Sequence, residues 1–263
     1  MKLHRLIALV AVPLMAHDLY LVPKPFRAKP GEIVTVAFHN GDDFPVPDRP
    51  PRVESMLNPQ ARVKGSPVAF LELRIDGKFL LADVTLPSTG TAVLSVHSKP
   101  NLIELQPLKF EEYLKHEGLE HVIRWRAEHS EAANSGRERY SKYVKSLVVV
   151  GASDRSFSQP VGFPIEIIPD GDPSTLKAGD TLAMHVLFRG KPAADLQIEM
   201  AWLTPEGKAE RKIAGRTDQA GKLRIPIGSR GIWKLHSVLM ERCAEPAVAD
   251  WESFWTSLTF EVR

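Results

Sequence analysis

The sequence predicts a mainly β protein in two parts. The first is an N-terminal β-sandwich-like domain with one helical insertion, and the second is a C-terminal immunoglobulin-like or prealbumin-like β-sandwich. Short runs of alternating apolar and polar residues recur along the chain, and turns rich in proline and glycine separate them. Only residues 109–128 have the spacing of an amphipathic helix. The predicted domains are residues 17–169 and 170–263.

Residues 1–16 have the pattern of a signal peptide. Two basic residues precede an apolar run from Leu6 to Met15, which stops at Ala16. This run is much shorter than the roughly 20 residues of a membrane-spanning helix. We therefore expect a soluble periplasmic or secreted protein that meets a membrane only through its leader. A buried strand or an uncleaved anchor are the alternatives, and Leu14 leaves the cleavage site uncertain by a residue or two.

Several strands can be placed in the N-terminal domain. Residues 32–39 alternate, with valine and phenylalanine side chains on one face. Asp76 and Gly77 separate two further alternating runs and predict a tight hairpin. Residues 45–65 contain five prolines, so we expect a long surface loop there.

The helical insertion at residues 109–128 has two apolar stripes on either side of Gly118. Glycine inside a helix costs roughly 1 kcal/mol relative to alanine, so we expect a kink or two short helices. Residues 132–139 are small and polar and predict a loop. Residues 140–150 predict a strand whose second half is apolar throughout and therefore buried on both faces.

The C-terminal domain begins after a stretch rich in proline, glycine and aspartate at residues 169–173. Its apolar alternations lie at residues 181–189, 196–203, 222–227, 231–240 and 253–262. Six or seven short strands at this spacing, without a helix, are typical of an immunoglobulin-like or prealbumin-like sandwich.

Composition and motifs argue against several functions. The formal net charge is +2, and no basic stripe is interleaved with aromatic residues, so nucleic acid is not an expected partner. The single cysteine, Cys243, excludes an intramolecular disulfide and is expected to be a small, partly buried side chain rather than a reactive thiol. We expect no catalysis, because nucleophile-elbow, phosphate-loop and zinc-protease motifs are missing from the sequence.

The strongest chemical lead is a new N-terminus. Cleavage after Ala16 would give His17 a free amine beside its imidazole, and these two nitrogens can chelate a divalent metal such as copper or nickel. Asp18 follows directly, and His236 is a candidate further ligand because it shares a strand face with Met240. The alternatives are a charged strand end in solvent for His17 and ordinary core packing for His236.

Three further histidines, His39, His97 and His185, lie on strand faces opposite apolar neighbours. We expect them to face solvent.

Motifs along the chain resemble a known family. They are residues 17–23, followed by Pro30-Gly31, then residues 109–114, 118–120, 139–147, 162–167, 172–173, 188–192, 217–221, 250–253 and 257–260. The sequence is identified as a member of the exported domain-of-unknown-function family DUF4198, which is named for nickel and cobalt uptake. The resemblance places the family's N-terminal His-Asp/Glu pair at His17 and Asp18. Leu19-Tyr20 stands where an aromatic pair is common.

From this resemblance we expect an accessory of nickel or cobalt uptake that binds the metal ion without catalysis and serves metal-uptake transporter components. The alternative is a non-catalytic module that binds an envelope protein or a carbohydrate. In that case the aromatic residues Trp251, Phe254, Trp255 and Phe260 could form an exposed docking patch, although such residues at strand spacing are commonly core.

Overall fold

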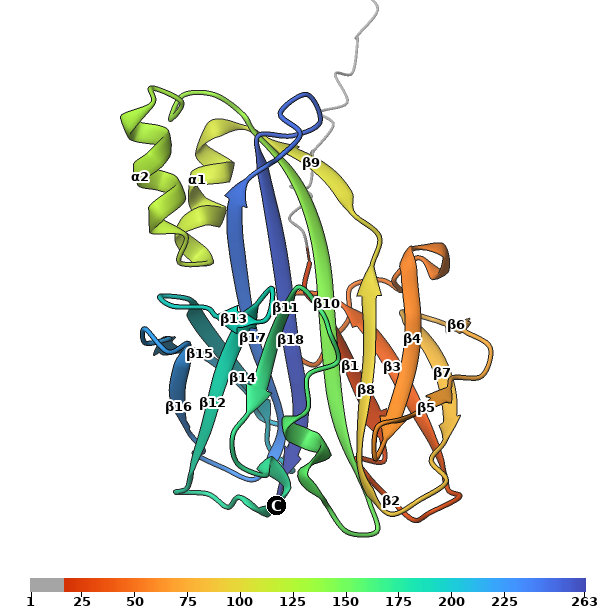
Figure 1. Cartoon of the computed structure of the whole chain (residues 1–263). Coiled ribbons are helices and arrows are strands. Elements are labelled where there is room, and N and C mark those ends of the chain that lie inside the picture. Colours follow the sequence, from red (N-terminus) through yellow and green to blue (C-terminus); the bar gives the residue numbers. More distant parts are fainter. Residues whose placement is uncertain (1–16) are drawn as a thin grey trace, which may run out of the picture.

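The computed structural model describes residues 17–263, and the predicted signal peptide, residues 1–16, lies outside them. The mainly β prediction is confirmed: three sheets pack face to face in a sandwich-like arrangement, with two short helices at one end (Figure 1). Neither of the helices in residues 17–263 is long and apolar enough to cross a membrane.

The largest sheet has ten strands and runs through the whole molecule. Its main path is β15 (Ala209–Arg216), β14 (Gln197–Leu203), β17 (Gly231–Arg242), β18 (Trp251–Val262), β10 (Gly136–Val150), β8 (Gly90–Ser98), β4 (Met56–Val63) and β5 (Ser66–Ala69), and β2 (Arg27–Ala28) and β9 (Asn101–Leu105) pair with β10. The sheet takes strands from both sides of the boundary predicted between residues 169 and 170. Its two halves are joined by the parallel pairing of β10 with β18.

Two smaller sheets cover the large one. The first contains, in order, β1 (Leu19–Lys24), β3 (Ile33–Asn40), β7 (Phe79–Thr85) and β6 (Arg74–Asp76). The second contains β11 (Ile165–Pro169), β12 (Thr181–Phe188), β13 (Lys191–Pro192) and β16 (Lys222–Pro226). The hairpin predicted at Asp76 and Gly77 is present between β6 and β7.

Strand β10 separates the two main cores. Val144, Val148 and Val150 face the core under the β1–β3–β7 sheet, whereas Leu147 packs into the core under β12. Side chains of a strand alternate between faces, so an apolar run of this kind can serve two cores at once. The prediction that this half of the strand is buried on both faces is confirmed.

The helical insertion folds as two short helices, α1 (Pro107–His116) and α2 (Glu120–Glu128), as predicted. Gly118 lies between them with a positive φ of 69°, a conformation that glycine adopts without strain. The helices pack against β17 and β18 through Val238, Met240 and two tryptophans. They thereby cover one end of the large sheet.

Two predictions about loops were wrong. The proline-rich segment contains β4, because a register shift between Leu57 and Gln60 takes Pro59 out of the ladder. Strand β10 begins at Gly136, inside the predicted loop, and a Cβ atom there would collide with the ring of Phe110. Glycine therefore allows the strand to pass close under α1.

Candidate functional site

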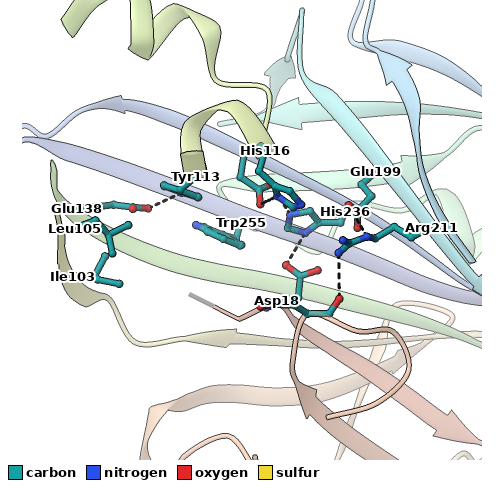
Figure 2. A pocket seen from close by; sticks show the side chains of 12 residues that line it. Asp18, Ile103, Leu105, Tyr113, His116, Glu138, Glu199, Arg211, His236 and Trp255 are labelled. Carbon is teal, nitrogen blue, oxygen red and sulfur yellow. Dashed lines mark hydrogen bonds and ion pairs between the residues drawn. The ribbon is translucent and has the colours of Figure 1, made fainter. Parts of the chain in front are cut away.

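A cavity of about 180 Å³ lies on one face of the large sheet, between helix α1 and the start of β1. Figure 2 shows its lining side chains, which come from the residue before β1, the turn after β3, the helix α1 and the residue that follows it, and strands β9, β10, β14, β15, β17 and β18. Five of them are acidic: Asp18, Asp42, Glu117, Glu138 and Glu199. So many carboxyl groups in one partly buried space must be balanced by nearby cations or bound protons.

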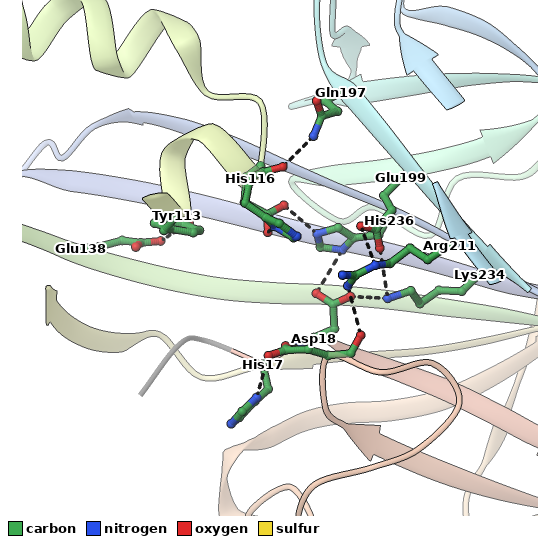
Figure 3. Close-up of polar contacts among 12 residues, drawn as sticks. His17, Asp18, Tyr113, His116, Glu138, Gln197, Glu199, Arg211, Lys234 and His236 are labelled. Atoms are coloured by element: carbon green, nitrogen blue, oxygen red, sulfur yellow. Dashed lines mark hydrogen bonds and ion pairs between the residues drawn. The ribbon is translucent and has the colours of Figure 1, made fainter. Parts of the chain in front are cut away.

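His236 lies between two carboxylates at the centre of this region (Figure 3). Its Nδ1 is 3.5 Å from Asp18 Oδ1, and its Nε2 is 3.2 Å from Glu117 Oε2. Burial acts to lower the pKa of the imidazole, but Asp18 and Glu117 outweigh it and raise that pKa above its usual value. Both ring nitrogens of His236 thus face carboxylates, which favour its protonated form.

Asp18 is fixed by a second cation, Lys234, whose side chain is completely buried and forms an ion pair with the Asp18 carboxylate. Burial acts to raise the pKa of Asp18, but His236 and Lys234 hold it well below its usual range. The backbone here is fixed as well, because Ser257 Oγ on β18 donates a hydrogen bond of 2.9 Å to the carbonyl of Leu19. The start of β1 is therefore anchored on the large sheet.

The His17 imidazole points away from His236 and lies against a different pair of carboxylates (Figure 3). Its Nδ1 is 3.2 Å from Asp42 Oδ2 and 3.3 Å from Asp48 Oδ2. The buried Lys142 ammonium donates a hydrogen bond to the His17 carbonyl. The structure thus brings Asp18 and His236 together and places the ring of His17 at a neighbouring position with two other acids.

The donor groups near His236 and His17 differ in how well they suit a metal ion. Within residues 17–263, no group of three or more His, Cys, Asp or Glu side chains has the arrangement of a metal centre. At His236 a metal would have to displace contacts to two carboxylates. At His17, one imidazole and two carboxylates lie close together on the surface, and a further donor would be needed to complete a set.

The remaining histidines and the aromatic residues near the C-terminus differ in how deeply they are buried. His39 is buried, contrary to the prediction that it faces solvent, and burial lowers its pKa to about 4. His97 and His185 are half-buried. The aromatic residues considered as an exposed docking patch, Trp251, Phe254, Trp255 and Phe260, are all buried and form part of the cores. Cys243 is also buried.

Glu138 is a buried acid at the opposite end of the cavity from Arg211 (Figure 2). It is only 1% exposed, and its Oε1 accepts hydrogen bonds from Tyr113 Oη, at 3.0 Å, and from Ser253 Oγ. Burial raises its pKa to about 7. This carboxyl group therefore keeps its proton to a higher pH in the folded chain than in the unfolded chain.

We expect Glu138→Gln to change how stability depends on pH. The wild-type stability contribution of Glu138 is complete below about pH 4.5 and is lost as the pH rises to about 7, because the unfolded chain releases this proton first. The loss amounts to at most about 3 kcal/mol for this shift. In chemical denaturation at pH 5 and pH 8, the free energy of unfolding of the variant should rise relative to that of wild type at pH 8. An equal difference at the two pH values would contradict the raised pKa.

Sequence reasoning missed Glu117, Lys234 and Glu138. Lys234 offered a signal, because it lies with His236 on a strand face that is otherwise apolar. Glu117 lies in the helical insertion, where charged residues are expected to face solvent. Glu138 lay in a predicted loop, where a buried carboxylate is not expected. Glu117 reaches His236 through the packing of α1 on the large sheet, whereas Lys234 and Glu138 belong to strands of that sheet.

Together, the fold and the site define a class of protein: a mainly β, sandwich-like protein with a charged cavity between a helical insertion and a long sheet. The family model described as Domain of unknown function (DUF4198) matches residues 14–241, and the chain belongs to this family. A search among curated proteins found no match to the chain.

Proposed function

We propose that this protein is an exported accessory of nickel or cobalt uptake that binds a divalent metal ion at its processed N-terminus. One observation carries the proposal: the Nδ1 atom of His17 lies within 3.3 Å of a carboxylate oxygen of both Asp42 and Asp48. Nickel and cobalt, together with the transporter as partner, come from the resemblance that the sequence motifs carry.

The donor set suits such an ion. Imidazole nitrogen and carboxylate oxygen are ordinary ligands for first-row divalent metals. Nδ1 is also the ring nitrogen that can close a chelate ring with the α-amine of the same residue. Cleavage after Ala16 would supply that amine, so His17 would provide two nitrogens while Asp42 and Asp48 provide oxygens. The bound ion would lie between the His17 ring nitrogen and the two carboxylates.

Asp18 and Lys142 have positioning roles in this proposal. The backbone N–H of Asp18 donates a hydrogen bond of 3.3 Å to Asp42 Oδ1, which orients that carboxylate. The Asp18 side chain is held in turn by Lys234 and His236. Lys142 binds the His17 carbonyl from the other side. These contacts fix His17, so metal binding costs little further conformational entropy.

The test is a calorimetric titration of chain beginning at His17 with Ni²⁺, Co²⁺, Cu²⁺ and Zn²⁺, its N-terminus verified by mass. We expect micromolar or tighter binding of Ni²⁺ or Co²⁺. One extra residue before His17 should weaken it at least tenfold, about 1.4 kcal/mol, because the amine is then an amide. The double variant Asp42→Asn/Asp48→Asn should weaken it to a similar extent.

A matched control exists elsewhere in the chain. His185 Nδ1 is 2.8 Å from Asp170 Oδ1, a histidine–carboxylate pair on β12 that is also partly exposed. Asp170→Asn should leave the affinity unchanged. Equal affinity of the native and extended N-termini would refute the amine ligand, and a lack of binding to all four ions would refute the proposed function.

A further inference from the structure

Glu138 differs from every other acid that lines the cavity. Asp18 pairs with Lys234, Asp42 with His17, and both glutamates on the Arg211 side have basic partners: Glu117 contacts His116 and His236, and Glu199 contacts Arg211. Within residues 17–263, Glu138 makes no ion pair. Its second carboxylate oxygen, Oε2, is buried and has no hydrogen-bond partner there.

An unpartnered buried acceptor is uncommon, because leaving such a group unsatisfied costs about 1–3 kcal/mol. In Figure 2 the Glu138 carboxylate points toward Tyr113, on the side of the cavity where Trp255 also lies. When Glu138 is ionised, the missing partner is a hydrogen-bond donor, and a cationic donor would balance the carboxylate charge as well.

The aromatic side chains beside Glu138 favour a cation. The rings of Tyr113 and Trp255 are stacked, with centroids 5.8 Å apart and planes at 6°, and both line the cavity. The faces of such rings attract ammonium groups, by about 0.5–2 kcal/mol according to exposure. Lys142 Nζ already lies 5.6 Å from the centre of the Trp255 ring. Ile103 and Leu105 on β9 add an apolar wall. The cavity thus combines a carboxylate, aromatic rings and an aliphatic surface.

We propose that this cavity binds a small primary amine in its ammonium form. An N–H of the ammonium donates to Glu138 Oε2, the charge lies against Trp255 and Tyr113, and the carbon body contacts Ile103 and Leu105. A cavity of about 150 Å³ can hold benzene, so about 180 Å³ suits a compact amine with a single ring or a short chain. The amine would bind at the Glu138 end of the cavity and does not depend on the His17 metal site, although Asp42 lines the same cavity.

Benzylammonium is a suitable probe, and benzyl alcohol is its neutral counterpart of nearly the same shape. In calorimetric titrations of the chain beginning at His17, carried out at pH 8 so that Glu138 is ionised, we expect benzylammonium to bind at least tenfold more tightly than benzyl alcohol. Glu138→Gln should abolish this preference. Glu104→Gln removes the same charge from an exposed position on β9 and should leave the preference intact.

Two further measurements keep the result interpretable. Ile103→Trp fills the apolar wall and should block benzylammonium even if Glu138→Gln folds poorly. Ni²⁺ binding should be unchanged in both variants, so failure of the amine site and failure of the metal site can be told apart. Equal binding of the two probes would show an apolar cavity only and overturn the proposal, as would a lack of binding at millimolar benzylammonium.

Discussion

Glu166→Ala is expected to lower the free energy of unfolding by about 3–5 kcal/mol, because it leaves a buried lysine without its counter-charge. Lys145 Nζ is 2.8 Å from Glu166 Oε2, and these two side chains are only 4% and 2% exposed. The same carboxylate accepts the backbone N–H groups of Val161, Gly162 and Phe163 at 2.8–3.0 Å. The substitution therefore leaves four donors unsatisfied where β10 meets β11.

Chemical denaturation of the purified variants measures this effect. Glu112→Ala, which breaks an exposed ion pair with Lys109, should change stability by less than about 1 kcal/mol. The double variant Lys145→Met/Glu166→Leu should recover part of the loss, because it removes both buried charges together but still leaves the three backbone N–H groups without their acceptor. A loss below about 1 kcal/mol in Glu166→Ala would contradict the account of this pair.

Lys234→Met is expected to have a comparable effect, about 3–5 kcal/mol, because it leaves the buried Asp18 carboxylate without its lysine counter-charge. The ammonium group of Lys234 also lies 3.9 Å from Glu199 Oε1 and 5.2 Å from the centre of the Tyr20 ring. Loss of this cation should loosen the start of β1. We therefore also expect weaker metal binding, since Asp18 orients Asp42.

Lys212→Met is the matched control, because Lys212 lies on β15 and is exposed. It should change neither stability nor metal affinity appreciably. If Lys234→Met unfolds at the same denaturant concentration as Lys212→Met, the buried ion pair does not hold the N-terminal segment.

Much of the fold could be predicted because strands and turns leave local signals. The alternation in β3 and β12 follows directly from burial of one strand face. Gly118 marked the break between α1 and α2. Strand β15 was missed because it is an edge strand rich in charged residues, a composition that protects edges but resembles a loop.

The site was less predictable, because its members come from distant parts of the chain. His17, Asp18 and His236 were selected as chemically capable residues, and the structure does bring Asp18 to His236. No local pattern indicates that Lys234 forms an ion pair with Asp18, or that Asp42 and Asp48 fold back to His17. A strand pattern shows which residues share a face but not which other strand will lie opposite that face.

The position of β18 determines when the protein can fold during its synthesis. This strand follows all the others along the chain, yet it lies in the middle of the large sheet, between β17 and β10 (Figure 1). Until residues 251–262 have emerged, β17 and β10 present open edges and one core lacks Phe254, Leu258 and Phe260. The large sheet therefore cannot be completed strand by strand in the order of synthesis. Products of premature termination would expose two unpaired strand edges that promote aggregation.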